Sequence, residues 1–179
     1  MQSAEVISFW FEEISPKAWW KKDPEFDSLV KHRFLSCHQA ANAGELYHWR
    51  ESPAGRLAEI IVLDQFSRNI FRDTPRAFSS DPLALVLAQE AVARGADREI
   101  PVGRRSFLYM PFMHSESLAM HELALDLFKA DGMKDNLDFE HRHMDIIKRF
   151  GRFPHRNRIL GRESTREELE FLQQPGSAF

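Results

Sequence analysis

Apolar residues recur along this chain at the three- and four-residue spacing of amphipathic helices. The clearest run starts at Asp23-Pro24, where Asp can cap a helix and Pro can occupy its first turn, and Gly44 can end it. No run alternates long enough with the period of two that is typical of a strand. Further helices are predicted from Ser52-Pro53 toward Phe71, from Asp81-Pro82 to Gly95, from Pro101, from Ser115 to Asp131-Gly132, over residues 137–150 and from Ser164-Thr165.

Short loops join these predicted helices, which favours antiparallel packing as hairpins. We therefore expect an all-α fold, with about seven to nine helices in a single domain over residues 1–179. Pro111 lies inside an apolar segment and should kink or end its helix, because it cannot donate an interior hydrogen bond. Ser115 can then cap a new helix, whose N-terminus would favour an anion near His114, while Glu116 is more simply interpreted as a cap.

Two Arg-Asn segments set among aromatic residues, 64–72 and 149–162, are the strongest candidates for a site. Guanidinium and amide groups are costly to desolvate, so near apolar rings they need partners, either one another or a bound anion. Asp64 and Arg68 are four residues apart on a predicted helix and face the core, so a buried ion pair is expected. We favour a structural role for that pair, which would leave Asn69 and Arg72 freer to bind a ligand.

Composition narrows the class of protein. Hydrophobic residues make up 43% of the 179 residues and aromatic residues 12%, which is typical of a globular chain. The net charge is −3, but residues 142–166 carry +6, which leaves −9 for the rest and argues against general nucleic-acid binding. The N-terminus has no basic leader and no stretch is apolar enough to span a bilayer, so a cytoplasmic protein is expected.

Other chemistries find little support in the sequence. His141 and His143 point to different sides of a helix, no His-Glu-x-x-His occurs, and His143 is interpreted as a core residue, so we predict no metal site. The single Cys37 has no catalytic signature around it, and no nucleophile elbow, Walker loop or complete dinucleotide fingerprint is present, so no cofactor is predicted. The paired carboxylates Glu12-Glu13 and Glu167-Glu168 are interpreted as solvated faces.

Several long segments together point to a family: residues 63–72, 109–116, 151–157 and 160–165, with Phe9-Trp10-Phe11 and Trp19-Trp20 near the start. They resemble the bacterial family known as domain of unknown function 924, over essentially the whole chain. The chain departs from the family at Ser67, where Pro is usual, so a straighter helix is expected there. The resemblance implies a tetratricopeptide-like arrangement of helix hairpins, a fold that usually offers a concave surface to a peptide. It supplies no reaction and no catalytic residue.

Two functions follow as hypotheses. The first is a site for a small anion, a carboxylate or a phosphate, walled by Phe66, Tyr109, Phe112 and Phe153, with His114 or His155 as the candidate for proton transfer. The second is a non-catalytic module that holds an acidic peptide or protein in a groove. A third interpretation has every polar group satisfied internally. The sequence selects neither a reaction nor an oligomeric state. The candidate ligand-binding residues are Arg68, Asn69, Arg72, His114, Arg152, His155, Arg156 and Asn157.

Overall fold

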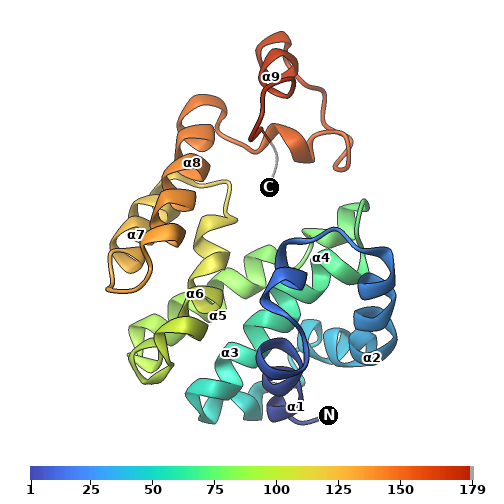
Figure 1. Cartoon of the computed structure of the whole chain (residues 1–179), viewed down its shortest axis with the longest axis vertical. Helices are drawn as coiled ribbons and strands as arrows, with labels where there is room; N and C mark the ends of the chain where they lie inside the picture. The colour runs from blue at the N-terminus through green and yellow to red at the C-terminus, as the bar shows by residue number, and fades with distance from the viewer. Residues whose placement is uncertain (178–179) are drawn as a thin grey trace.

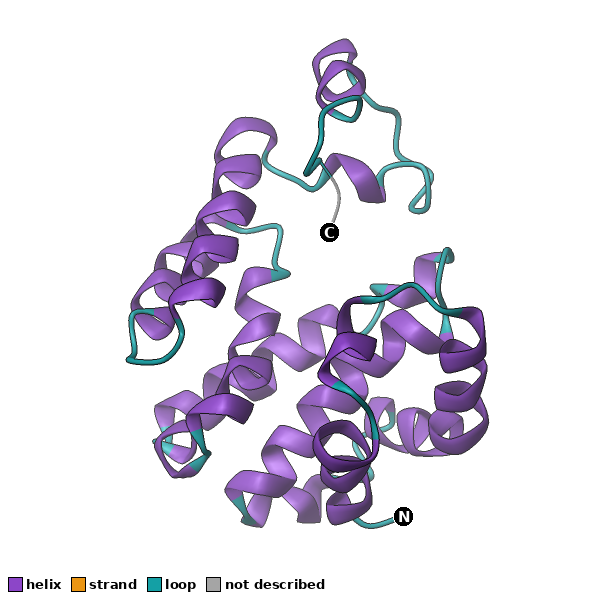
Figure 2. Cartoon of the chain, in the orientation of Figure 1, coloured by secondary structure: helices purple, strands orange, loops and turns teal. Residues whose placement is uncertain are grey.

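The computed structural model describes residues 1–177, and over these residues it is helical without a strand (Figures 1 and 2). The all-α prediction is confirmed, and residues 178 and 179 of the expected 1–179 domain lie outside the described part. Within that part the α-helices are α1 (Ser3–Ser8), α2 (Pro24–Asn42), α3 (Pro53–Ile61), α4 (Ser67–Ile70), α5 (Asp81–Ala93), α6 (Val102–Met113), α7 (Leu118–Phe128), α8 (Lys134–Phe150) and α9 (Arg166–Phe171).

Three helices, α2, α3 and α9, begin where the sequence places a capping residue. The Asp23 carboxylate accepts hydrogen bonds from two amides of the first turn of α2, and the Ser52 hydroxyl accepts one from Gly55 in α3. Thr165 and Glu168 form a capping box at the start of α9. The predicted cap at Ser115 is wrong, because α7 begins at Leu118 and Ser117 occupies its N-cap position.

The predicted helix from residue 53 toward Phe71 forms, but it is not one regular helix. A π-helical turn, Val62–Phe66, separates α3 from α4. The Ser67 hydroxyl follows this turn, donating to the Leu63 carbonyl at 2.6 Å and lying 2.7 Å from the Nε2 of buried His38. The expected straighter segment at Ser67 is therefore interrupted by a wide turn, a feature that is frequent at functional sites.

A large aromatic core joins the π-helical turn Phe9–Glu13, which follows α1, to α2 and to the π-turn Val62–Phe66. The ring of Phe34 lies 4.8 Å from that of Phe9 and 4.6 Å from that of Phe66, and Trp10 makes edge contacts with Phe66 and Phe107. Because these rings are at most 1% exposed, the turn that carries Asp64 is anchored from both sides of the core.

The later helices pack in sequence order. α6 runs through Pro111 to Met113 and contacts α7. α7 and α8 lie side by side as a hairpin, an arrangement compatible with tetratricopeptide-like packing (Figure 1).

The C-terminal segment, residues 151–177, begins at Gly151, whose φ of +68° turns the chain out of α8. Its Phe153 joins Ile146 and Ile147 of α8 in a second small core, against which Phe150 of α8 and Phe171 pack. Among residues 1–177, no helix combines the length and apolarity that a membrane crossing requires.

Candidate functional site

A buried carboxylate and a histidine meet at the centre of the molecule. Asp64 lies in the π-turn with no exposed surface, and His114 directly follows α6. The His114 Nδ1 lies 2.7 Å from Asp64 Oδ1, and the Gln65 amide donates to Asp64 Oδ2 at 2.6 Å. His114 was predicted to hydrogen-bond a ligand, and one of its ring nitrogens instead contacts Asp64.

The charges around this pair set both protonation states. Burial alone would raise the pKa of Asp64, but the Arg68 guanidinium and His114 outweigh it and lower that pKa below its usual range. Burial lowers the pKa of His114, and Arg68 adds to this, while Asp64 opposes it. At neutral pH the site therefore holds an ionised Asp64 beside an uncharged imidazole.

Arg68 connects two acidic residues. Its Nη1 lies 3.1 Å from Asp64 Oδ1, which confirms the expected pair, and it also donates to the Asp64 carbonyl at 2.7 Å. Its two terminal nitrogens donate to the carboxylate of Asp81 at 3.0 and 3.1 Å. The sequence indicated Asp81 only as a helix start, and its role as the second partner of Arg68 was missed.

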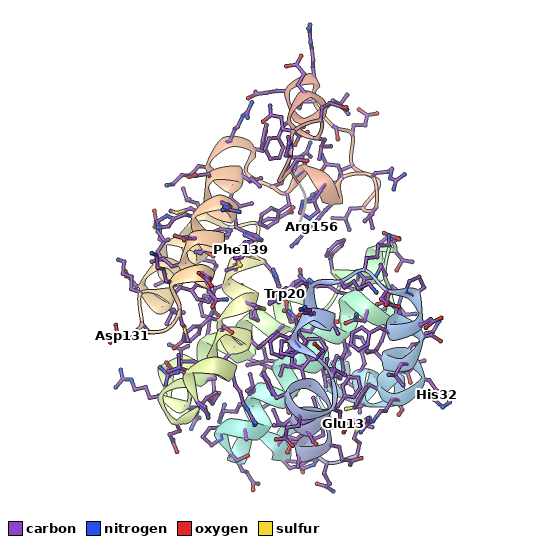
Figure 3. All side chains as sticks on the ribbon, in the orientation of Figure 1. Glu13, Trp20, His32, Asp131, Phe139 and Arg156 are labelled. Carbon is purple, nitrogen blue, oxygen red and sulfur yellow. The ribbon has the colours of Figure 1, made fainter. Side chains whose placement is uncertain are left out.

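Arg156 reaches the same carboxylate from the C-terminal segment, and Figure 3 shows it on the side of that segment that faces the rest of the helical body. Its Nη1 lies 3.4 Å from Asp81 Oδ2 and its Nη2 donates to the His114 carbonyl at 3.0 Å. The guanidinium lies 4.6 Å from the ring centres of both Phe78 and Phe153. The two Arg-Asn segments therefore meet, through Arg68 and Arg156, at Asp81.

The Arg156 side chain is unusual in its burial. Only 8% of it is exposed, and its Nε is buried without a hydrogen-bond acceptor among the described residues. Burial, together with the charge of Arg68, lowers the pKa of Arg156 to about 10, so it stays charged at neutral pH. A buried N–H donor without an acceptor costs free energy and needs an explanation. We call Asp64, Arg68, Asp81, His114 and Arg156 the central site.

Two further histidines lie around Phe153. The His143 ring is 6.5 Å from that of His114, and its Nδ1 donates to the Phe139 carbonyl at 2.8 Å, which confirms the core role predicted for it. Burial lowers the pKa of His143 to about 3 and that of His155 to about 4. The charges of Arg156 and Arg68 contribute to the shift of His155, so this predicted site residue lies next to the central site. Its ring is 5.7 Å from that of Phe153.

The side chains of Asn69 and Arg72 do not contact the residues of the central site. Both bind Asp27 of α2: the Asn69 amide donates at 2.8 Å, and the Arg72 guanidinium donates from Nε and Nη2 at 2.5 and 2.7 Å. The expectation that these two side chains are the freer members of their segment is wrong. Asp27 lies more than 40 positions away in sequence, where no helical spacing rule could indicate it.

Arg72→Ala should therefore weaken the fold rather than a ligand site. Loss of the two-point contact leaves Asp27 with Asn69 alone, so we expect the free energy of unfolding in urea to fall by about 1–2 kcal/mol. Lys22→Ala, which removes an exposed pair with Asp73, is the control and should change it by less than about 0.5 kcal/mol. Equal effects of the two substitutions would contradict a structural role for Arg72.

Arg152 and Asn157 belong to a separate network in the C-terminal segment. Arg152 donates to both carboxylate oxygens of Glu168, at 2.7 and 2.8 Å, and the Asn157 amide donates to Glu168 at 3.3 Å and to Ser164 at 3.0 Å. Glu168 is 2% exposed, so its interpretation as part of a solvated face is wrong. Hydrogen bonds led by that from Arg152 lower its pKa to about 2.

Glu116 does not cap α7. Its carboxylate accepts two hydrogen bonds from Arg162, at 2.6 and 2.8 Å, and one from the Phe153 amide at 2.8 Å. It therefore holds the C-terminal segment against the end of α6, beside the central site. Arg162 also donates to the Asn157 side-chain oxygen at 2.9 Å, which links this contact to the Glu168 network.

The predicted aromatic walls are mostly wrong. Phe66 belongs to the main core, Tyr109 donates its hydroxyl to Asp97 at 2.7 Å, and Phe112 is 2% exposed in that core. Phe153 does flank Arg156, and Phe78, which sequence reasoning missed, forms the other side. The available signal for Phe78 was an aromatic residue six positions beyond the end of the first Arg-Asn segment.

Two surface hollows lie away from the central site. One, of about 500 Å³, is lined by one face of α2: Ser28, Lys31, His32, Leu35, Ser36 and Gln39. The other, of about 70 Å³, is mostly apolar and is lined by Ile7, Pro53, Ala54, Leu57, Glu99, Ile100, Pro101 and Arg104. Within residues 1–177, no group of three or more His, Cys, Asp or Glu side chains is arranged to hold a metal ion.

The fold and the central site define a class of protein: an all-helical chain in which arginines, aspartates and a histidine from four separate stretches converge on a buried ionic network. A model of the family described as bacterial protein of unknown function (DUF924) matches residues 6–176, and the chain belongs to this family. It is similar to the solved structure of a protein of unknown function from Agrobacterium tumefaciens, with a TM-score of 0.90, 42% identity and 96% of each chain covered. No match was found among curated proteins.

Proposed function

We propose that the central site binds a small oxyanion, a carboxylate or a phosphate. The observation that carries the proposal is the buried Arg156 Nε without an acceptor. A guanidinium has five N–H donors. Among residues 1–177, acceptors for Arg156 are found at Asp81 and at the His114 carbonyl, and both bind the terminal nitrogens. The Nε donor is left without an acceptor, and a bound oxyanion would supply one.

The surroundings favour an anion over a neutral ligand. Arg68 and Arg156 bring two positive charges close together, which is why Arg68 contributes to the lowered pKa of Arg156. Asp64 and Asp81 offset those charges, so a bound oxyanion would be stabilised mainly by directed hydrogen bonds from Arg156 in a site of low dielectric constant. The flanking rings of Phe78 and Phe153 fix the plane of the guanidinium and so prepare it for a planar or tetrahedral oxyanion.

The alternative function, an acidic peptide held in a groove, has less support. It requires basic side chains left exposed along a surface. Arg72, Arg152 and Arg162 are each engaged by two hydrogen bonds to a carboxylate of the same chain. These side chains could bind a peptide only by breaking contacts that hold the fold. A small ligand at Arg156 breaks none of them.

Thermal unfolding in the presence of phosphate, acetate and citrate tests the proposal. A ligand present at 100 times its Kd stabilises by about 2.7 kcal/mol, which would raise the Tm of a chain of this size by roughly 5–10 °C. We expect at least one of the three anions to produce such a shift and Arg156→Gln to abolish it. Arg158→Gln is the matched control, because Arg158 is exposed two positions away, and it should keep the shift.

Binding of the same anion, measured by calorimetry at 10 °C, covers the case in which Arg156→Gln lowers the Tm. Binding that persists in Arg156→Gln, or the absence of a shift with every anion in the wild-type protein, would exclude this site.

A further inference from the structure

His114 differs from the other buried histidines whose contacts are fully described. His121 uses both ring nitrogens, with Nδ1 2.6 Å from Glu140 Oε1 and Nε2 2.8 Å from the Ser115 carbonyl, and it has no exposed surface. His38 is 4% exposed and its Nε2 lies against the Ser67 hydroxyl. His114 is 17% exposed, and its Nε2 has no hydrogen-bond partner among the described residues. Because Nε2 is not among the fully buried side-chain atoms that lack a hydrogen bond, a small group from solution can reach it.

The contacts of Asp64 determine which nitrogen of His114 carries the proton. The Asp64 carboxylate accepts from Gln65 Nε2 at 2.6 Å and lies 3.1 Å from Arg68 Nη1, so its position is fixed from two sides. An ionised carboxylate accepts hydrogen bonds only, so the His114 Nδ1 at 2.7 Å must donate. In a neutral imidazole the lone pair then lies on Nε2, the nitrogen that is open to solvent.

The residue that carries this nitrogen is hydrogen-bonded to the proposed anion site. The backbone carbonyl of His114 accepts from Arg156 Nη2 at 3.0 Å, so the residue that presents Nε2 is tied directly to the guanidinium that would hold the ligand. A carboxylate that orients a histidine, next to a cation that can hold an oxyanion, is the arrangement that general-base chemistry requires.

We infer that Asp64 and His114 form a proton-transfer dyad, in which His114 Nε2 removes a proton from a water or hydroxyl group bound beside an anion on Arg156. In this step the O–H bond breaks, an N–H bond forms on Nε2, and the electron pair stays on the oxygen, which becomes a nucleophile. The imidazolium that results is stabilised by Asp64. Asp64 is a positioning residue here. The inference rests on the proposed anion site for its substrate, but the reactivity of Nε2 is a property of the dyad alone.

Several charged groups face His114 and affect its titration. Asp64 and Arg68 lie on the π-turn and α4, Asp81 on α5, His143 on α8, and His155 and Arg156 on the C-terminal segment. Burial, followed by the charge of Arg68, lowers the pKa of His114, while Asp64 and Asp81 oppose that shift. Its imidazole should therefore carry a proton less often at pH 5.5 than an ordinary surface histidine, whose pKa lies near 6.5.

Diethyl pyrocarbonate, which modifies neutral imidazole nitrogens, tests the dyad in the full-length protein with mass spectrometry to identify the sites. At pH 5.5 we expect His114 to react at least as fast as the exposed His32 and His48, and His121 not to react. Asp64→Asn should slow the modification of His114 at least about 10-fold, because the amide no longer holds the proton on Nδ1. An unreactive His114 in the wild-type protein, or an unchanged rate in Asp64→Asn, would overturn the inference.

Two further measurements complete the test. Nitrogen-15 NMR of the wild-type protein reports the tautomer of His114 without any substitution: the form protonated on Nδ1 supports the dyad, and the form protonated on Nε2 overturns it. Phosphate is then added to the modification reaction. Protection of His114 supports both proposals, whereas a reactive His114 without protection keeps the dyad and contradicts the anion site for phosphate.

Discussion

Arg68→Ala should lower the free energy of unfolding by about 3 kcal/mol, among the largest effects expected of any single polar substitution in the chain. Arg68 is the common partner of Asp64, which has no exposed surface, and of Asp81, which is 16% exposed. Its removal leaves Asp64 with His114 and Gln65 alone. Breaking a buried pair by removing one partner costs about 3–5 kcal/mol, and the 20% exposure of Arg68 places this case at the lower end. Urea unfolding at pH 7 measures it.

The pH dependence of this loss identifies its cause. Asp64 has a folded-state pKa below its ordinary value of 3.8, so its ionisation contributes stability that is present above that value and is lost as the pH falls. The difference between wild type and Arg68→Ala should therefore be larger at pH 7 than at pH 3. Arg166→Ala is the control, because Arg166 is 94% exposed and pairs with the exposed Glu170, and it should cost less than about 0.5 kcal/mol. A difference that does not change with pH would show that Asp64 is not the group involved.

Helix positions could be predicted from the sequence because their causes are local. Asp23, Ser52 and Thr165 each cap the helix that the apolar pattern places after them. The pair of Asp64 and Arg68 was predictable for the same reason, since four residues of helix bring them together. The π-turn was not, because an extra residue in one turn leaves no mark in apolar spacing and is stabilised by tertiary packing around Phe66.

The partners of the arginines could not be predicted in the same way. Arg72 was expected to be freer because Asp64 was taken to satisfy Arg68, yet Asp27 of α2 meets Arg72 across the helix interface. Arg156 was expected near Arg68 because both lie in Arg-Asn segments set among aromatic residues, and the residue that joins them, Asp81, was interpreted as a local helix start. Such contacts depend on how helices pack, so only the three-dimensional structure separates a structural arginine from one with donors to spare.

The central site and the C-terminal segment are mechanically linked. Glu116 holds the Phe153 amide and Arg162, and Arg156 holds the His114 carbonyl, so polar contacts dock residues 153–162 beside the dyad. The segment shares a small core with the end of α8, apart from the main core. Its internal stability, and with it the position of Arg156, therefore depends strongly on the network around Glu168.

Glu168→Ala should lower the free energy of unfolding by about 2–3 kcal/mol, which corresponds to a Tm lower by roughly 5–10 °C. Glu168 accepts two hydrogen bonds from Arg152, one from Asn157 and one from the Thr165 amide. The substitution removes the capping box of α9 and leaves Arg152, 29% exposed, without its carboxylate. Amide exchange should show the loss first within residues 152–171, because that segment holds the network.

Glu167, the neighbour of Glu168, supplies the matched control for this substitution. Glu167 is 61% exposed and pairs with Arg149 on the surface, so Glu167→Ala removes the same carboxylate from the same turn and should cost less than about 0.5 kcal/mol. The pKa of Glu168 is lowered from 4.5 to about 2, so the stability it supplies is complete above pH 4.5 and is lost as the pH falls toward 2. The gap between wild type and Glu168→Ala should narrow over that window. Equal costs for the two substitutions would mean that Glu168 lies in solvent, as the sequence alone had suggested, and that Arg156 is positioned without it.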